Sequence, residues 1–315
     1  MGPKVSVLII TYNHEKYIAQ TVASALNQEV NFQYEILVGD DCSTDHTREI
    51  LKELAIAHPE RIRLFLREEK GSGLPGKTNF VETLKACRGE YVALLDGDDY
   101  WTDVTKLQKQ VNFLDAKPEF AVCFHNVEVA YEDQSQESWN YCPVDQKETS
   151  TIEDLLERNF IATSSTVFRR SPEALPDWFL RMKTGDWALH VLNAQRGKVG
   201  YIDEVMSVYR IHHGGYWSKQ ETIQNTLDEI VMFQALGKYL PRKHSAQIKS
   251  HLASLFYKLA DQYNSRGEKR NALVSALRSL GANPGDQAIL VRHVKEISYP
   301  RFIARIKALL GGKSS

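Results

Sequence analysis

Several features that mark particular classes of protein are missing from the 315-residue sequence. No apolar run approaches the roughly 18 to 20 residues of a membrane span, and no basic segment followed by a long apolar one stands at the N-terminus. The cysteines show no paired spacing, which argues against a zinc site and against a disulfide framework; they are Cys42, Cys87, Cys123 and Cys142. We therefore expect a cytoplasmic protein whose thiols stay reduced.

An excess of charge of one sign is also lacking. Lysine and arginine number 39 and aspartate and glutamate 40, so the formal net charge is -1 and no overall positive field attracts nucleic acid. No Gly-x-Gly-x-x-Gly motif follows the first predicted strand and no Walker A motif is present, which weakens an interpretation as a dinucleotide-binding or P-loop protein. The composition, 43% hydrophobic and 25% charged, is that of an ordinary globular protein.

Apolar, strand-length runs alternate with segments of helical periodicity through the first hundred residues. The predicted strands cover 5–10, 34–38, 62–66 and 91–95, and the predicted helices cover 17–26, 47–57 and 78–86. This alternation predicts an α/β fold with a doubly wound, mostly parallel sheet flanked by helices. In such a fold, ligands bind beyond the carboxyl ends of the strands.

The stretch YVALLDGDDYW, residues 91–101, is the most informative part of the sequence. Its apolar strand ends in the carboxylates of Asp96, Asp98 and Asp99, with Gly97 between the first two. Carboxylates so close in sequence repel one another, and a bound Mg²⁺ or Mn²⁺ that also holds phosphate oxygens would relieve the repulsion. A polar turn explains the same residues, since Asp and Gly are turn formers. Taken alone, the motif leaves both interpretations open.

Polar residues also follow the first two predicted strands. Thr11 to Asn13 come after the first strand and Asp41 after the second. The segment around Asp41 could serve only as helix cap and turn. However, the carboxyl ends of parallel strands share one edge of a sheet, so these clusters and residues 96–99 should converge there. The convergence predicts a binding site at that edge.

Two further candidates lie in the second half of the chain. Asp186 opens a predicted helix, where an acid is favoured by the helix dipole and where a catalytic base could also stand. His212 and His213 follow a predicted strand at 199–209, as a metal or phosphate contact or as structural residues. We predict a strand at 120–130, a surface loop at 132–150 and a short strand at 164–168.

Five blocks in the same order resemble the family 2 glycosyltransferases of the GT-A fold. They are VSVLIITYN, GDDCSTDHT, Asn79 ahead of RGEYVALLDGDDYW, GDW and YRIHHGG, spread over residues 5–217. The resemblance implies a GT-A, Rossmann-like domain that binds a nucleotide sugar, with a UDP-sugar favoured. It also implies inverting transfer of the sugar to a hydroxyl of a saccharide or lipid-linked acceptor, in bacterial surface polysaccharide synthesis, with Mn²⁺ or Mg²⁺ as cofactor.

The resemblance also implies roles for single residues on the donor side. Tyr12 lies near the nucleobase, Asp41 accepts a hydrogen bond from it, and Asp96 faces the ribose or sugar. The full set implied to contact the nucleotide sugar is Thr11, Tyr12, Asn13, Asp41, Asn79, Asp96 and Gly97.

The resemblance implies that three other residues bind the metal or take part in the chemical step. Asp98, the second acid of the Asp-x-Asp motif, and His212 are implied to hold the metal, and Asp186 is implied to be the general base. One base suffices, because inversion needs a single displacement. The family often has Glu where this chain has Gly185, which removes an acidic neighbour of the base. For Lys77, as for Arg67, we weigh a contact to the diphosphate against a solvated surface charge.

Residues 221–315 carry none of the five blocks and are predicted to form an all-helical appendage to a catalytic domain at 1–220. Segments 252–263 and 272–280, followed by a turn at 283–285, resemble one tetratricopeptide-like hairpin. Segment 299–310 predicts a basic amphipathic helix, which either lies on anionic lipid at the inner face of the membrane or packs as a terminal helix.

Two alternatives to a glycosyltransferase would each leave a mark in the sequence. A sugar nucleotidyltransferase would carry a Gly-rich, basic loop after the first strand, where this chain has Thr11-Tyr12-Asn13-His14. A catalytically inactive scaffold that binds partners through its helical tail would be marked by loss of Asp98 or Asp186, and both are present.

Overall fold

The computed structural model describes residues 2–69, 74, 76–183, 185–214 and 222–282. The chain divides into two compact units, residues 1–219 and 220–315, which are described separately below. The predicted assignment of catalysis to residues 1–220 and of an appendage to residues 221–315 stays a prediction.

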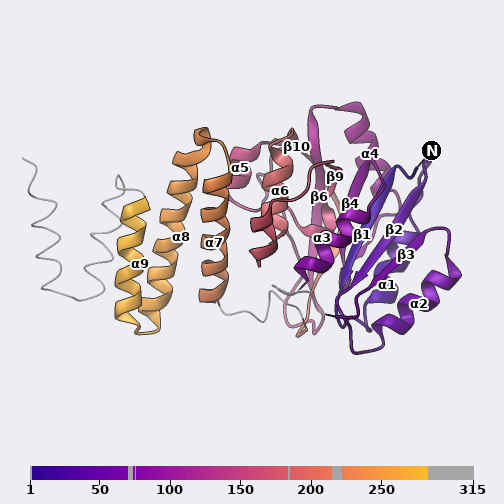
Figure 1. Ribbon diagram of the computed structural model, residues 1–315, viewed down its shortest axis with the longest axis horizontal. Coiled ribbons are helices and arrows are strands. Elements are labelled where there is room, and N and C mark those ends of the chain that lie inside the picture. The colour runs from indigo at the N-terminus through magenta and orange to yellow at the C-terminus, as the bar shows by residue number, and fades with distance from the viewer. Residues whose placement is uncertain (1, 70–73, 75, 184, 215–221, 283–315) are drawn as a thin grey trace, which may run out of the picture. The chain divides into compact units, whose positions relative to one another are not determined.

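The first unit is built on one large sheet with the order β3-β2-β1-β4-β9-β6-β10-β5, while β7 pairs with β6 and β8 with β10 (Figure 1). Its strands are β1 (Val5–Thr11), β2 (Tyr34–Asp40), β3 (Ile62–Leu66), β4 (Tyr91–Asp96), β5 (Tyr100–Trp101), β6 (Phe120–Tyr131), β7 (Trp139–Asn140), β8 (Thr149–Ser150), β9 (Val167–Arg169) and β10 (Lys198–Ile211). Strands β3, β2, β1 and β4 are parallel, as are β6 and β10, and β9 runs antiparallel between β4 and β6. The predicted mostly parallel α/β sheet is confirmed.

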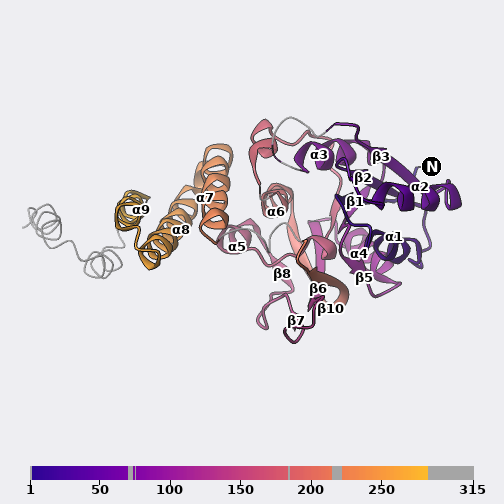
Figure 2. The same ribbon diagram turned by 90° about the horizontal axis from the view of Figure 1, so that it is seen from below.

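Helices cover both faces of this sheet, with α3 on one side of β1 and with α1 and α4 on the other (Figure 2). The helices are α1 (Ile18–Leu26), α2 (Thr47–Ala57), α3 (Lys77–Ala86), α4 (Lys106–Ala116), α5 (Ile152–Glu157) and α6 (Asp186–Ala194), with 3-10 turns η1 (Thr163–Ser165) and η2 (Asp177–Arg181). The continuous apolar run of β1 is buried on both faces, as expected for a central parallel strand. Val7 and Ile9 of β1 share one core cluster with Ile18, Leu51 and Leu107 of the helices.

The chain reverses its direction of sheet growth at β1. It proceeds from β1 outward to β2 and β3 and then returns to place β4 on the other side of β1. Ile10 of β1 is paired with Asp96 of β4, and Thr11 of β1 with Asp40 of β2. The ends of these strands therefore bring the three polar clusters together at the switch point, where crevices form in such sheets.

Several predicted elements of the first unit differ from the structure. The predicted strand at 164–168 begins as the 3-10 turn η1, because the hydroxyls of Ser165 and Thr166 donate to Ala162 O and compete with strand pairing. The predicted loop at 132–150 contains β7 and β8, which are only two residues long and depend on pairing with β6 and β10. The predicted strand at 199–209 extends to Ile211, because β10 pairs with β6 as far as Tyr131.

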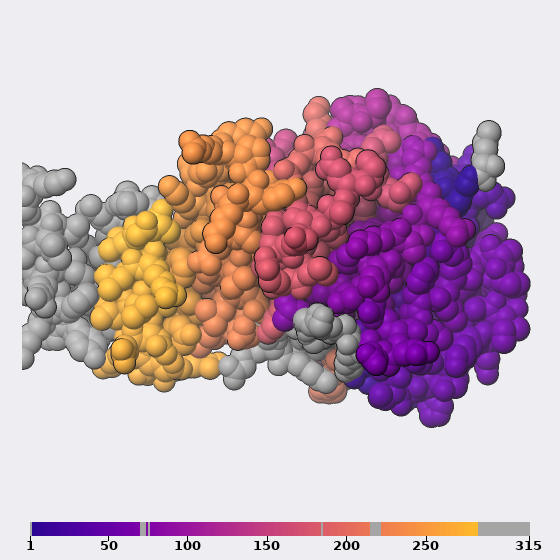
Figure 3. Space-filling model, in the orientation of Figure 1, coloured from indigo at the N-terminus to yellow at the C-terminus, as the bar shows by residue number. Residues whose placement is uncertain are grey.

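The second unit contains α7 (Thr222–Tyr239), the 3-10 turn η3 (Arg242–His244), α8 (Ser245–Ser265) and α9 (Lys269–Ala282). Its helices lie side by side in chain order, and the surfaces of α8 and α9 adjoin in orange and yellow (Figures 1 and 3). Helices α8 and α9 form the predicted hairpin around Gly267, which has φ +76, and both are longer than predicted. The predicted turn at 283–285 and the predicted helix at 299–310 lie outside the described residues.

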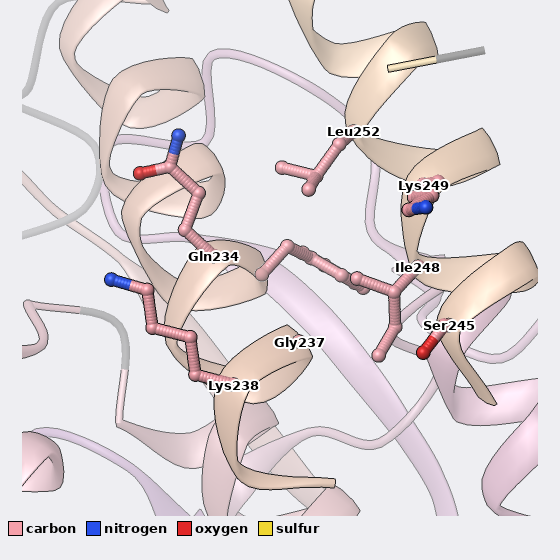
Figure 4. Close-up of a pocket in the computed structure, with 8 residues that line it drawn as sticks. Gln234, Gly237, Lys238, Ser245, Ile248, Lys249 and Leu252 are labelled. Carbon is pink, nitrogen blue, oxygen red and sulfur yellow. The ribbon is translucent and has the colours of Figure 1, made fainter. Parts of the chain in front are cut away.

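A hollow of about 440 Å³ lies between α7 and α8 (Figure 4). It is lined by Phe233, Gln234, Gly237, Lys238, Ser245, Ile248, Lys249 and Leu252. None of the predicted site residues lines it. Within the described part of the chain, no helix combines the length and the apolar character that crossing a membrane requires.

Candidate active site

Two loops at the switch point are tied together by hydrogen bonds. We call residues 12–15, after β1, and 41–46, after β2, the paired loops. Asn13 has φ 55, a left-handed conformation that Asn tolerates better than most residues. Its N–H donates to Ser43 Oγ at 2.9 Å, and its Oδ1 accepts from Thr44 N at 2.8 Å. The Asn13 side chain therefore holds the loops in register, and Tyr12 beside it is 40% exposed.

The acids at the end of β2 differ in their partners. Asp40 is fully buried and pairs with Arg48, whose Nε lies 2.5 Å from Asp40 Oδ1. Asp41, the residue predicted to contact the base, donates its backbone N–H to Thr11 O at 3.0 Å. Its Oδ2 accepts from Gly76 N, also at 3.0 Å, immediately before α3. Asp41 therefore links the paired loops to α3.

Asn79 and Gly97, both predicted to contact the donor, are packed closely here. Asn79 is 1% exposed and donates its Nδ2 to Gly39 O at 2.8 Å, which ties α3 to β2. Within the described ranges its Oδ1 has no hydrogen-bond partner. A Cβ at Gly97 would lie 2.7 Å from Thr11 Oγ1 and 2.8 Å from His14 Nδ1, so only glycine fits. The donor contacts of both residues stay predictions.

Asp99 anchors the acidic turn and is itself 1% exposed. Its Oδ1 accepts from Arg210 N at 2.9 Å. Burial, together with the charges of Asp98 and Asp96, raises the pKa of Asp99 well above its ordinary value. The Thr21 hydroxyl lies 2.7 Å from Asp99 O. Asp99 therefore fixes the turn between β4, α1 and β10.

Asp98 meets two imidazoles, from opposite ends of the first unit's sequence. Its Oδ2 lies 3.0 Å from His212 Nε2 and 3.6 Å from His14 Nε2. Burial alone would raise the pKa of Asp98, but the hydrogen bond with His212 and the proximity of His14 lower it overall. One ligand atom from each of the three residues lies within 4.8 Å of the others. This converging set of one carboxylate and two imidazoles fits a divalent cation, and imidazole favours transition metals over Mg²⁺.

The two imidazoles lie against the ring of Tyr17. The Tyr17 ring lies 4.6 Å from the His212 ring and 6.2 Å from the His14 ring, centroid to centroid. Tyr17 donates its hydroxyl to Glu132 at 2.8 Å, and the guanidinium of Arg210 lies 4.7 Å from the Tyr17 ring. His14 was not predicted as a ligand, although it directly follows the predicted Thr-Tyr-Asn segment. Its contact with Asp98 is tertiary and has no local sequence pattern.

The predicted base stands in a second charged group. We call Lys77, Asp96 and Asp186 the acid-lysine cluster. Asp186 is the first residue of α6, and Lys77, the first residue of α3, is 8% exposed with its Nζ 5.0 Å from the Phe179 ring. Burial lowers the pKa of Lys77 to about 8, while the charges of Asp186 and Asp96 oppose that shift. Burial raises the pKa of Asp96 to about 7, with Asp98 and Asp186 adding to the increase.

The position of Lys77 corrects one alternative and explains a departure from the family. The interpretation of Lys77 as a solvated surface charge is wrong, because the residue is buried and its ammonium lies close to Gly185. A Cβ at Gly185 would collide with Lys77 Nζ. The family's Glu at this position is therefore sterically incompatible with Lys77 in its present place. Arg67, the other candidate, pairs with Glu82 instead.

Known proteins are similar to this chain over most of its length. The family model described as Glycosyl transferase family 2 matches residues 6–174. Uncharacterized protein Rv1520 of Mycobacterium tuberculosis is 35% identical over 304 residues, which cover 94% of this chain and 80% of that protein.

Two solved structures share the fold. Staphylococcus aureus TarS 1-349 in complex with UDP-GlcNAc matches with a TM-score of 0.64 and 19% identity, over 89% of this chain and 81% of that chain. The mannosyltransferase PcManGT from Pyrobaculum calidifontis, in complex with GDP-Man and Mn²⁺, matches with a TM-score of 0.58 and 17% identity, over 99% of this chain and 89% of that chain. At these identities the structural matches speak for the fold.

Proposed function

The chain belongs to glycosyl transferase family 2 and is a glycosyltransferase, and from this premise we propose its reaction. It transfers a sugar from a nucleoside diphosphate sugar, with a UDP-sugar favoured, to a hydroxyl of a saccharide or lipid-linked acceptor, and inverts the anomeric centre. The observation that carries the proposal is the convergence of His14, Asp98 and His212 at the end of β4. The charges of Asp98 and Asp186 both act on Asp96, which stands between the two groups.

The donor half of the proposal rests on the paired loops. The exposed ring of Tyr12 offers a stacking surface for a nucleobase, and Asp41 keeps one carboxylate oxygen beyond the one bonded to Gly76. The two solved structures described above are complexes with nucleotide sugars, UDP-GlcNAc and GDP-Man. This supports a nucleotide-sugar donor but does not distinguish one nucleotide from another.

His14, Asp98 and His212 would hold the divalent cation beside the diphosphate. When bound there, Mn²⁺ or Mg²⁺ would neutralise the charge that grows on the leaving nucleoside diphosphate. The paired imidazoles favour Mn²⁺ between these two ions. The Tyr17 ring packs against the imidazole of His212, and the guanidinium of Arg210 lies over the Tyr17 ring in turn.

Asp186 accepts the proton of the attacking acceptor hydroxyl. As that O–H bond breaks, the acceptor oxygen forms a bond to the anomeric carbon, and the bond from that carbon to the diphosphate oxygen breaks with its electron pair. A single displacement of this kind inverts the centre. Lys77 is mostly protonated at neutral pH, because its pKa is about 8, and its ammonium stabilises the neighbouring carboxylates. Membership of the family argues against the sugar nucleotidyltransferase, and the presence of both Asp98 and Asp186 argues against the inactive scaffold.

A binding screen tests the donor half directly. Thermal shift and calorimetry would compare UDP, GDP, CDP and dTDP, each with Mn²⁺, Mg²⁺ or EDTA. We expect one diphosphate to stabilise the protein only with metal, and Asp98→Ala to abolish the effect. Glu53→Ala, which removes an exposed carboxylate on α2, is the control and should behave as wild type. If no nucleotide binds under any condition, the proposed function is wrong.

A further inference from the structure

An exposed tryptophan lies on β7, in the acidic segment between β6 and β8. The Trp139 side chain is 48% exposed, although Trp is usually well buried. It stacks on Tyr141 with the ring planes at 16° and the centroids 6.3 Å apart. The two rings therefore form one aromatic surface that is partly open to solvent.

The strand register places this surface in line with β10. Trp139 is paired with Val129 of β6, and Val129 is paired with Tyr209 of β10. Residues paired directly across neighbouring strands point to the same face of a sheet. Tyr141, two residues after Trp139, donates its N–H to Val127 O at 2.8 Å and continues the alignment. Trp139, Tyr141 and Tyr209 therefore share one face.

That face also borders the proposed reaction centre. Tyr209 adjoins Arg210, whose backbone N–H donates to Asp99 at 2.9 Å, so Tyr209 lies beside the acidic turn. Burial raises the pKa of Tyr209, and the nearby charges of Asp99, Asp98 and Asp96 add to the shift. Burial likewise raises the pKa of Tyr141, with Asp186 adding to the shift. The aromatic surface thus extends from the exposed ring of Trp139 to the neighbourhood of the proposed base.

We propose that Trp139 and Tyr141 form a stacking platform for a sugar ring of the acceptor, which is therefore a saccharide. The proposal rests on the proposed function, because it places the acceptor beside Asp186. One face of a pyranose ring presents C–H groups, which pack on an aromatic face, while its hydroxyls stay solvated or hydrogen-bonded. Trp and Tyr provide a large and rigid contact area at low cost in conformational entropy.

The charge of the surrounding segment selects the kind of saccharide. Residues 132–150 contain one lysine, Lys147, and five acids, Glu132, Asp133, Glu137, Asp145 and Glu148. Their negative field repels a polyanionic acceptor. The platform therefore fits an uncharged oligosaccharide, or an uncharged stretch of a longer glycan, better than a polyol phosphate chain.

Saturation-transfer NMR tests the platform with defined probes. Cellotetraose, chitotetraose, mannotetraose, galactotetraose and poly(ribitol phosphate) would be titrated in the presence of UDP and Mn²⁺. We expect wild type to bind at least one uncharged tetrasaccharide. Trp139→Ala should weaken that binding roughly tenfold, and Trp139→Phe should retain most of it. Tyr239→Ala, which removes a tyrosine of α7 that is 46% exposed, is the control and should change nothing.

Nucleotide binding distinguishes failure of the stacking platform from failure of the proposed function. The affinity for UDP with Mn²⁺ should be the same in Trp139→Ala and wild type, which also shows that the variant is folded. The platform is wrong if Trp139→Ala binds the tetrasaccharide as tightly as wild type. It is equally wrong if wild type binds only poly(ribitol phosphate), or no probe while still binding UDP. If UDP also fails to bind wild type, the proposed function fails, and the platform with it.

Discussion

The two sides of the site differ in how their polar side chains are satisfied. In the paired loops, Asn13 and Asp41 make hydrogen bonds to the backbone, and the buried Asp40 at the end of β2 is neutralised by Arg48. In the acid-lysine cluster, burial and neighbouring charge raise the pKa of Asp96 and lower that of Lys77. The first side is suited to holding a ligand in a fixed place. The second keeps charged groups away from water, and in such surroundings a small change of charge at the reacting atoms changes the electrostatic energy strongly.

The largest effect is expected from the proposed base. Asp186→Asn keeps the shape of the side chain but removes its ability to accept a proton. We expect the rate of sugar transfer to fall by roughly 10²–10⁴ and the affinity for nucleotide and metal to stay unchanged. The measurements are steady-state kinetics and calorimetry. Asp177→Asn, at an exposed position in η2, is the matched control. A variant with more than half of the wild-type rate would rule out Asp186 as the base.

Lys77→Met tests whether the acid-lysine cluster acts as one unit. The change removes the ammonium that opposes the rise in the pKa of Asp96, so this pKa should move above its present value of about 7. Activity that needs ionised Asp96 should then begin at higher pH, and the rate at pH 7 should fall about tenfold. The pH profile of kcat/KM provides the measurement. Lys85→Met on the exposed side of α3 is the control. If the acid limb of the pH profile stays at the same pH in Lys77→Met, Lys77 does not influence the ionisation of Asp96.

His14→Ala tests the metal ligand that the paired loops contribute. Loss of one imidazole should weaken Mn²⁺ binding about 10 to 100-fold and Mg²⁺ binding much less, because imidazole favours the transition metal. Calorimetry with each ion in the presence of the best nucleotide would measure this. His213→Ala removes the exposed neighbouring histidine and should change neither affinity. Equal losses for the two ions would contradict a ligand role for His14.

The smallest effect is expected in the paired loops. Asn13→Ala removes the hydrogen bond to Thr44 N and puts a residue that disfavours φ 55 at this position. We expect a loss of about 1–2 kcal/mol in the free energy of unfolding and only a few-fold loss in nucleotide affinity. Asn13→Gly removes the same hydrogen bond without the strain and should lose less. Chemical denaturation of both variants would check the order, and the reverse order would show that strain is not involved.

Much of the fold could be predicted because it is carried by local patterns. Helix α2 and strand β3 begin and end at the predicted residues, since each is a periodic or continuous apolar segment. Strands β7 and β8 were missed because two-residue strands exist only through their partners. The 3-10 turn η1 was missed because hydroxyl-to-backbone bonds override the β-branched residues around it.

The site could be predicted in part for the same reason. Asp96 and Asp98 end an apolar strand, and that break in pattern is visible along the chain. His14 meets Asp98 only because β1 and β4 are neighbours in the sheet. The burial of Lys77 arises where α3 approaches Gly185, more than a hundred residues away in sequence. Such tertiary contacts have no signal in the local sequence.

The collision that a side chain at Gly185 would make with Lys77 has a consequence for how these positions vary. A substitution at either position changes the space that is open to the other side chain, so the effects of substitutions at the two positions should be coupled. Gly185→Glu alone should displace the ammonium. Combined with Lys77→Ala, the same glutamate would have room to enter. Double-mutant energies should then be far from additive.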